Sequence, residues 1–240
     1  MTRALMHGAD ANKLSQNGTS SLAYLMTEQP FQQKMVLSIL KSHGKFKNTA
    51  EEEAIFHVFI KSHYQISNPF LLEKLLHYKV FASLRENHFI NALHETAVTC
   101  NLHSLEVMKV LIAYMTKAHV EIRQVMSHID DNGDSIMHNV VNGNGSHRRP
   151  SMIQYLILCG ANTLQEDKQG NTPEQCAKLY APIDRPGQTN LIAILEKVRI
   201  TRECYLAFSM GIHPTIGRDS VVNGLYSEII DNMLSLTIND

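Results

Sequence analysis

The sequence contains no tryptophan, seven prolines and only four cysteines among its 240 residues. The cysteines are far apart and lie within apolar helical patterns, at Cys100, Cys159, Cys176 and Cys204. Neither a disulfide framework nor a close metal-binding pair fits this spacing. We therefore expect free, buried thiols and a reducing, cytoplasmic compartment.

Charge of one sign and long apolar runs are also lacking. With 22 Lys and Arg against 23 Asp and Glu, the formal net charge is −1, which argues against a nucleic-acid partner. No stretch approaches the ~20 apolar residues of a membrane-spanning helix, so we expect no membrane span. A hydrophobic content of 44% is still enough to fill a core.

Catalytic and metal-binding signatures are missing as well. The sequence has no phosphate-binding G-x-x-x-x-G-K-[ST], no G-x-S-x-G and no G-x-G-x-x-G, so we expect no enzyme activity and no cofactor. None of the 13 histidines pairs with a cysteine at a zinc spacing. Asp130, Asp131 and Asp134 lack the later glutamate and the alternating spacing of a calcium loop. We expect no metal site.

What the sequence does contain is clearest in residues 167–177. Gly170 supplies the positive φ of a tight turn, and Pro173 fits the first position of a helix. Thr172 can cap that helix, and Gln175 completes a capping box with it. Just upstream, an apolar run at 153–158 is closed by Gly160, as in a helix that ends at a left-handed glycine. This pattern predicts a helix, a turn and a second helix.

The order helix, Gly-Ala-Asn, Asp-x-x-Gly-x-Thr-Pro, helix resembles the ankyrin repeat, whose period is about 33 residues and whose hallmark is T-P-L-H-x-A. The residue at the buried Leu of that hallmark recurs at intervals of 34, 37, 44 and 37 residues, at Leu22, Phe56, Leu93, Met137 and Glu174. Second helices are predicted over residues 34–40, 69–78, 105–115 and 190–198. The resemblance implies an all-α fold: an ankyrin-repeat solenoid of about five helix-turn-helix repeats, some degenerate, with a C-terminal helical cap.

Two segments account for intervals longer than the ideal period of about 33 residues. Residues 142–150 read as an insertion between the helices of the fourth repeat, and residues 116–126 lengthen the join before it. The second repeat is the faintest, because residues 45–53 contain neither the turn glycine nor the Thr-Pro cap.

The resemblance divides the chain in two. Residues 1–198 would form the ankyrin array, and residues 199–240 two further helices, at 199–210 and 219–236, that cap the stack. The array begins in mid-repeat, which we interpret as a piece of a longer polypeptide; the alternative is a natural start whose half-repeat serves as a cap.

The resemblance also assigns roles to side chains. His57, His94 and His138 occupy the His of the hallmark and are expected to hydrogen-bond between neighbouring repeats. Turn tips and first helices line a groove in this family, so a protein partner of unknown identity is expected at the variable tips. These are Leu14, Gln16, Glu86, His88, Asp131, Asn132, Asp134, Lys168, Gln169 and Asn171.

Three alternatives remain open at this stage. The irregular period and helical tail are similar to ankyrin segments of effectors that intracellular bacteria deliver into host cells, which would place the chain in a host cytosol. The module could instead serve to target or regulate an enzyme whose catalytic part lies upstream or in residues 199–240. A structural oligomer built by the tail is a third reading, although we expect a monomer.

Overall fold

The structure is a computed structural model that describes residues 10–27, 33–61, 68–100, 103–143, 149–179 and 188–212, with the side chains of the last segment from 189 to 202. Over these residues the fold is all-α, as predicted, with eleven helices and no strand. One isolated bridge joins Ile129 to Ser135. The chain divides into two compact units, Met1–Val125 with Gly143–Gly145, and Met126–Asn142 with Ser146–Asp240.

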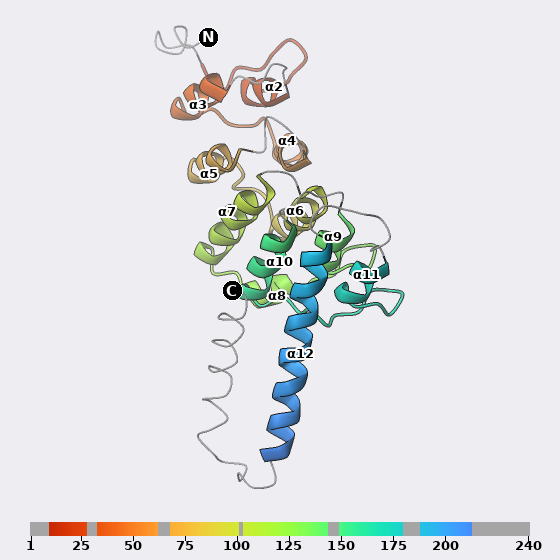
Figure 1. Cartoon of the computed structure of the whole chain (residues 1–240). Helices are drawn as coiled ribbons and strands as arrows, with labels where there is room; N and C mark the ends of the chain where they lie inside the picture. Colours follow the sequence, from red (N-terminus) through yellow and green to blue (C-terminus); the bar gives the residue numbers. More distant parts are fainter. Residues whose placement is uncertain are drawn as a thin grey trace. The chain divides into compact units, whose positions relative to one another are not determined.

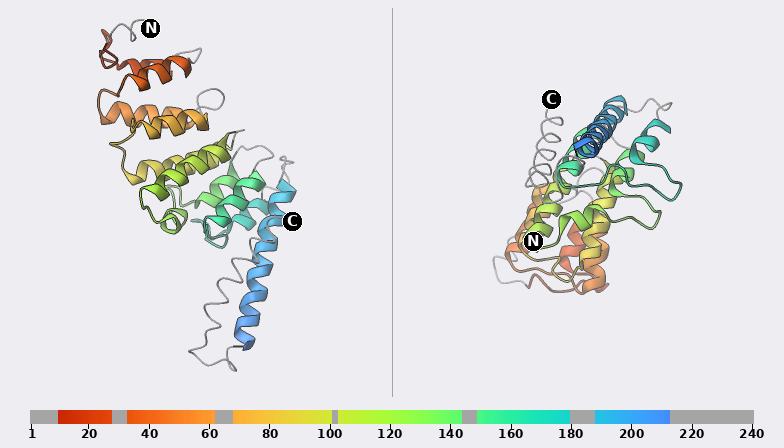
Figure 2. Two further views of the ribbon diagram at one scale, coloured as in Figure 1. Left: turned by 90° about the vertical axis from the view of Figure 1, so that its left-hand side faces the viewer. Right: turned by 90° about the horizontal axis from the view of Figure 1, so that it is seen from below.

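The first unit consists of three consecutive helix pairs (Figure 1). They are α2 (Ser21–Thr27) with α3 (Gln33–Lys41), α4 (Thr49–Lys61) with α5 (Pro69–His77), and α6 (Glu86–Thr99) with α7 (Ser104–Lys117). The first helices α2, α4 and α6 contact one another in order, and so do the second helices α3, α5 and α7. The helix pairs are therefore stacked one after another, with the first helices in one layer and the second helices in another (Figure 2).

The second unit repeats this arrangement. Helix α9 (Ile136–Asn142) packs on α10 (Arg149–Leu158) and α11 (Pro173–Leu179), and α12 (Gln188–Ile212) packs on α10 and α11. A short helix, α8 (Ile122–Met126), precedes it in the join of residues 116–126. The sequence did not predict α8, which has only five residues.

Local sequence explains where the helices begin. The side chain of Asn68 accepts a hydrogen bond from the Phe70 N–H at 2.9 Å, and Pro69 is the first residue of α5. At α11, the Thr172 N–H donates to the Gln175 side chain at 2.7 Å and the Gln175 N–H donates to the Thr172 hydroxyl at 3.4 Å. The predicted capping box is confirmed.

The second helices α3, α5, α7 and α10 all end in the same way. In each, an N–H just past the helix donates to a carbonyl five residues earlier, at 2.9–3.1 Å, from Gly44, Val80, Val120 and Ala161. The residue before each donor is left-handed, with φ of 57°, 54°, 61° and 89° at His43, Lys79, His119 and Gly160. This is the Schellman end, which these four helices share.

The core follows the predicted register. Leu22, Phe56, Leu93 and Met137 are fully buried, and Glu174 is 6% exposed. Each lies in the first helix of its pair. The five positions are therefore buried, as expected for the core positions of these helices.

Two predicted boundaries need correction. Residues 190–198 and 199–210 were expected to form separate helices, but α12 runs through both without a break. Helix α10 begins at Arg149, inside the predicted insertion at 142–150. The predicted helix at 219–236 and the half-repeat at residues 4–9 lie outside the described residues.

Candidate partner-binding surface

The turns before α9 and α11 have the same hydrogen-bond pattern. At the first, the Asp130 N–H donates to the Asp134 carbonyl and the Gly133 N–H to the Asp130 carbonyl, both at 2.9 Å. The Asp130 carboxylate accepts from the N–H groups of Asn132 and Asp134 at 2.9 and 3.0 Å. An aspartate at the first position therefore fixes the whole turn.

The second turn repeats these bonds 37 positions later, with Asp167 in place of Asp130 and Gly170 in place of Gly133. The Asp167 carboxylate accepts from the N–H groups of Gln169 and Asn171, both at 2.8 Å. Before α2 the same turn uses a hydroxyl, because the Thr19 N–H donates to Ser15 Oγ at 3.1 Å.

The tips of the two turns in the second unit are exposed. Asp131, Asn132, Lys168 and Gln169 all lie at the surface. The Lys168 ammonium donates to the Asp131 carbonyl at 2.6 Å, so the two tips are adjacent. These predicted site residues therefore form one continuous edge.

Asp134 and Asn171 were predicted as tip residues too, but they are half-buried. The Asn171 carbonyl accepts a hydrogen bond from His138 Nε2 at 3.0 Å, and its N–H binds Asp167. The pKa of Asp134 is raised by burial and by the negative charge of Asp130. Both residues thus help to build the turns.

The other four predicted residues lie in the first unit. Leu14 is 42% exposed, and Gln16 and Glu86 are also at the surface. His88 is half-buried, and its Nε2 lies 3.3 Å from the Glu53 carboxylate. Leu14 and Gln16 share one turn, whereas Glu86 and His88 share the first turn of α6.

The outer face of the first helices contributes residues that the tip-based prediction omitted. Tyr24 on α2, Val58 on α4 and Val98 on α6 are 50%, 44% and 43% exposed. Beside them, Glu95 accepts from Lys61 and His57 at 3.2 and 3.3 Å. Helical spacing could have found this face, since Tyr24 and Val58 each follow the buried motif position by two residues.

His138, Asp167 and Cys176 place one nitrogen, oxygen and sulfur within 4.8 Å of one another. Both ring nitrogens of His138 are engaged, Nδ1 with Ser135 Oγ at 2.8 Å and Nε2 with the Asn171 carbonyl. Burial and the hydrogen bond to Asp167 raise the pKa of the Cys176 thiol to about 12. Cys176 Sγ lies 3.4 Å from the Asp167 carboxylate, so the three residues take part in a hydrogen-bond network that joins the two turns.

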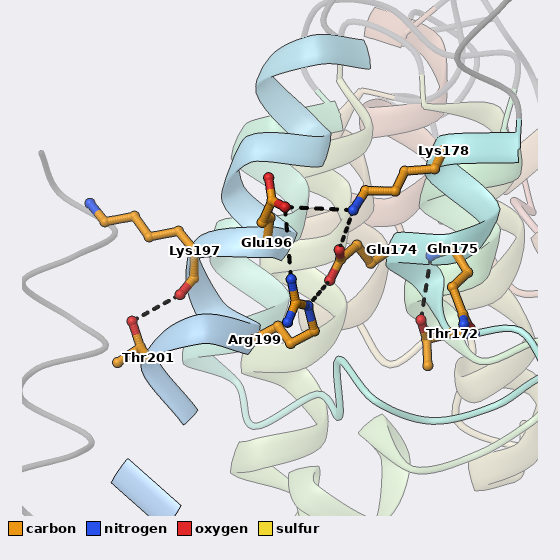
Figure 3. Close-up of polar contacts among 8 residues, drawn as sticks. All are labelled: Thr172, Glu174, Gln175, Lys178, Glu196, Lys197, Arg199 and Thr201. Carbon is orange, nitrogen blue, oxygen red and sulfur yellow. Dashed lines mark hydrogen bonds and ion pairs between the residues drawn. The ribbon is translucent and has the colours of Figure 1, made fainter. Parts of the chain in front are cut away.

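Glu174 stands where the motif has a buried leucine. Its carboxylate binds the Lys178 ammonium at 2.7 Å and the Arg199 Nε at 2.9 Å (Figure 3). Glu196 on α12 lies 3.6 and 3.7 Å from the same two cations. Burial alone would raise the pKa of Glu174, but the hydrogen bonds and charges of Lys178 and Arg199 lower it overall. This cluster fixes α12 on α11.

Comparison with known proteins finds no family model, curated protein or solved structure that matches the chain. Among the described residues, no helix is both long and apolar enough to cross a membrane.

Proposed function

We propose that the chain is an ankyrin-type solenoid that works as a non-catalytic protein–protein interaction module. A protein partner is held by the exposed turn tips and by the outer face of the first helices. That this partner is bound in the cytosol of a host cell stays a prediction from the sequence.

The observation that carries the proposal is the repeated turn before α9 and α11. Its backbone is fixed by Asp130 and Asp167 from within, while the side chains of Asp131, Asn132 and Gln169 point to no described partner and are exposed. A rigid backbone that presents exposed variable side chains loses little conformational entropy on binding. Such loops on a rigid scaffold are common binding sites.

The first-helix face supports the same function. Tyr24, Val58 and Val98 are exposed apolar side chains on three helices that are consecutive in one layer. These helices also carry the Lys61–Glu95 and His88–Glu53 pairs, and exposed apolar side chains among charged ones suit a protein-binding surface.

The test compares two variants with equal changes of charge. Asn132→Lys with Gln169→Lys alters the tips, and Ser151→Lys with Asn190→Lys alters exposed positions on the second helices α10 and α12. Each is used as bait in a lysate of host cells, and captured proteins are purified and titrated against the baits. Circular dichroism confirms that each bait is folded.

We expect a protein that binds the wild type and the second-helix variant with equal affinity, and the tip variant at least about tenfold more weakly. Equal binding to all three baits would refute the assignment of the tips. Conversion of a small-molecule substrate by the wild-type chain alone would refute the non-catalytic part of the proposal.

A further inference from the structure

The loops before α2, α4 and α6 in the first unit carry nearly all of their charge as cations. Six exposed basic side chains lie on these loops or where they leave a helix: Lys13, Lys41, Lys45, Lys47, Lys79 and Arg85. We call these six residues the basic edge. None of them forms an ion pair with a described carboxylate, and the exposed acidic residues in the described parts of these loops or directly beside them are Asp10 and Glu86.

The first two loops are joined by an asparagine. The Asn12 side chain accepts from the Lys45 N–H at 2.8 Å and donates to the His43 carbonyl at 3.4 Å. Gly18 and the Lys47 ammonium also lie close together, since a Cβ at Gly18 would be 3.4 Å from that nitrogen. The loops that carry Lys13, Lys45 and Lys47 are therefore adjacent.

The second and third loops are joined by aromatic rings. Phe46 stacks on Phe81 with ring centroids 5.7 Å apart, and Phe81 also packs edge-on against Phe56 in α4 at 4.9 Å. These contacts fix the loop that carries Lys79 and Arg85 beside the loop that carries Lys45. The three loops that carry these cations are therefore adjacent.

Nearby carboxylates do not neutralise this surface. Glu51 is half-buried and accepts hydrogen bonds from the N–H groups of Ser20 and Lys47 at 3.0 and 2.6 Å. Glu52 is buried and binds Ser83 at the start of the next pair. Both bind the backbone of the loops, and although the charge of Lys47 also acts on Glu51, the six cations outnumber the exposed carboxylates beside them.

From this juxtaposition we propose that the basic edge binds an acidic segment of a protein partner. Carboxylates complement these cations, whereas a chain of net charge −1 gains little long-range attraction to a nucleic-acid backbone, which favours an acidic protein segment. Exposed Leu14 and Tyr78, at 42% and 38%, adjoin Lys13 and Lys79 and suit a segment that alternates acidic and apolar residues. The inference rests on the proposed protein-binding function, which it deepens by giving the chemistry of the partner.

The probe is a fluorescein-labelled peptide in which glutamate alternates with leucine and serine, long enough to cross three loops. Its binding to the wild type is measured by fluorescence anisotropy. Lys13→Glu with Lys45→Glu and Lys47→Glu reverses three charges of the edge. The matched control, Lys34→Glu with Lys74→Glu and Lys117→Glu, makes the same change on the second helices α3, α5 and α7.

We expect the edge variant to bind the peptide at least about tenfold more weakly than the control variant, and wild-type binding to weaken as salt rises from ~0.05 to ~0.3 M. Equal losses in the two folded variants would mean that only net charge matters and would overturn the proposal. So would failure of the wild type to bind the peptide, or binding only of phosphatidylserine vesicles or of an oligouridine RNA.

The two proposals can fail separately. A captured partner that depends on Asn132 and Gln169, together with no binding of the acidic peptide, would remove the basic edge alone. If the edge variant loses peptide binding but the tip variant captures the partner as well as the wild type does, the tip assignment alone is wrong.

Discussion

His138 and His57 occupy the same position of the motif in different helix pairs, but their surroundings differ. His138 is fully buried, and its two nitrogens connect Ser135 to Asn171 in the next turn, as predicted for the role of this histidine. The His57 side chain is 34% exposed and contacts the Glu95 carboxylate on α6. At the same motif position, His138 thus binds a backbone carbonyl of the next turn, whereas His57 binds a side chain of the next first helix.

Glu174 is the residue whose replacement tests the buried ion cluster. Glu174→Gln keeps the size of the side chain but removes the charge that Lys178 and Arg199 surround. We expect a loss of about 1–3 kcal/mol in the free energy of unfolding at pH 7, measured by urea denaturation. The matched control is Glu196→Gln, which removes an exposed carboxylate of the same cluster and should cost less than about 1 kcal/mol.

The pH dependence of this effect has a definite sign. The pKa of Glu174 is below its ordinary value of 4.5 in the folded chain, so its stabilisation is complete above that value and is lost as the pH falls below it. The difference between wild type and Glu174→Gln should therefore shrink between pH 5 and more acid conditions. A difference that stays constant there would contradict the pairing of a charged Glu174.

At the scale of elements, the paired turns offer a comparison of two glycines. Gly133 and Gly170 are both left-handed, with φ of 86° and 79°, so alanine is strained at either. A Cβ at Gly133 would also lie 2.3 Å from Lys168 Cγ, whereas nothing lies within 4 Å at Gly170. We expect Gly170→Ala to cost about 1 kcal/mol and Gly133→Ala clearly more, by urea denaturation.

A double-mutant cycle tests why Gly133→Ala should cost more stability than Gly170→Ala. Adding Lys168→Ala should bring the cost of Gly133→Ala close to that of Gly170→Ala, because the side chain that the methyl group meets is removed. Equal costs for the two single glycine variants would show that Lys168 does not lie over the first turn.

Helix ends were predictable from the sequence where one or two residues determine them. Helix α11 begins with the capping box of Thr172 and Gln175, and α5 begins with Asn68 and Pro69. Both signals lie within four residues of the chain, so they can be recognised without knowing any distant contact. The second pair was faint because its turn has no glycine and no Thr-Pro cap. Helix α4 begins instead after Asn48, whose side chain accepts from the Glu51 N–H at 2.9 Å, and its Glu51 and Glu52 bind the N–H groups of Ser20 and Ser83, each 31 positions away.

The C-terminal boundary illustrates the opposite error. A break was expected between residues 198 and 199 because the repeat period ends there, yet no proline or glycine occurs between residues 188 and 210. With no breaker in this stretch, the helix continues. Arg199 on α12 then pairs with Glu174 on α11. The two residues are 25 positions apart, and no local sequence pattern predicts their contact.

At the scale of the molecule, the net charge of −1 concealed an uneven distribution. The loops of the first unit carry the basic edge, whereas the turns before α9 and α11 carry Asp130, Asp131, Asp134 and Asp167. Because the whole chain has 22 basic and 23 acidic residues, its composition gave no sign of the basic surface that the folded loops create. The tips were predictable from the resemblance, but the basic edge required the contacts of Asn12 and Phe46.

The proposed solenoid makes a prediction for cooperativity. In a stack of repeats, each pair is stabilised mainly by its neighbours, so damage should spread over a short range. Leu93→Ala in α6 and Met137→Ala in α9 each remove a fully buried side chain and should cost about 2–5 kcal/mol. We expect Leu93→Ala to speed hydrogen exchange in α4 to α7 more than in α11 and α12, and Met137→Ala to do the reverse. Exchange that accelerates equally in both units for both variants would indicate one cooperative domain and would contradict a stack built from nearest-neighbour contacts.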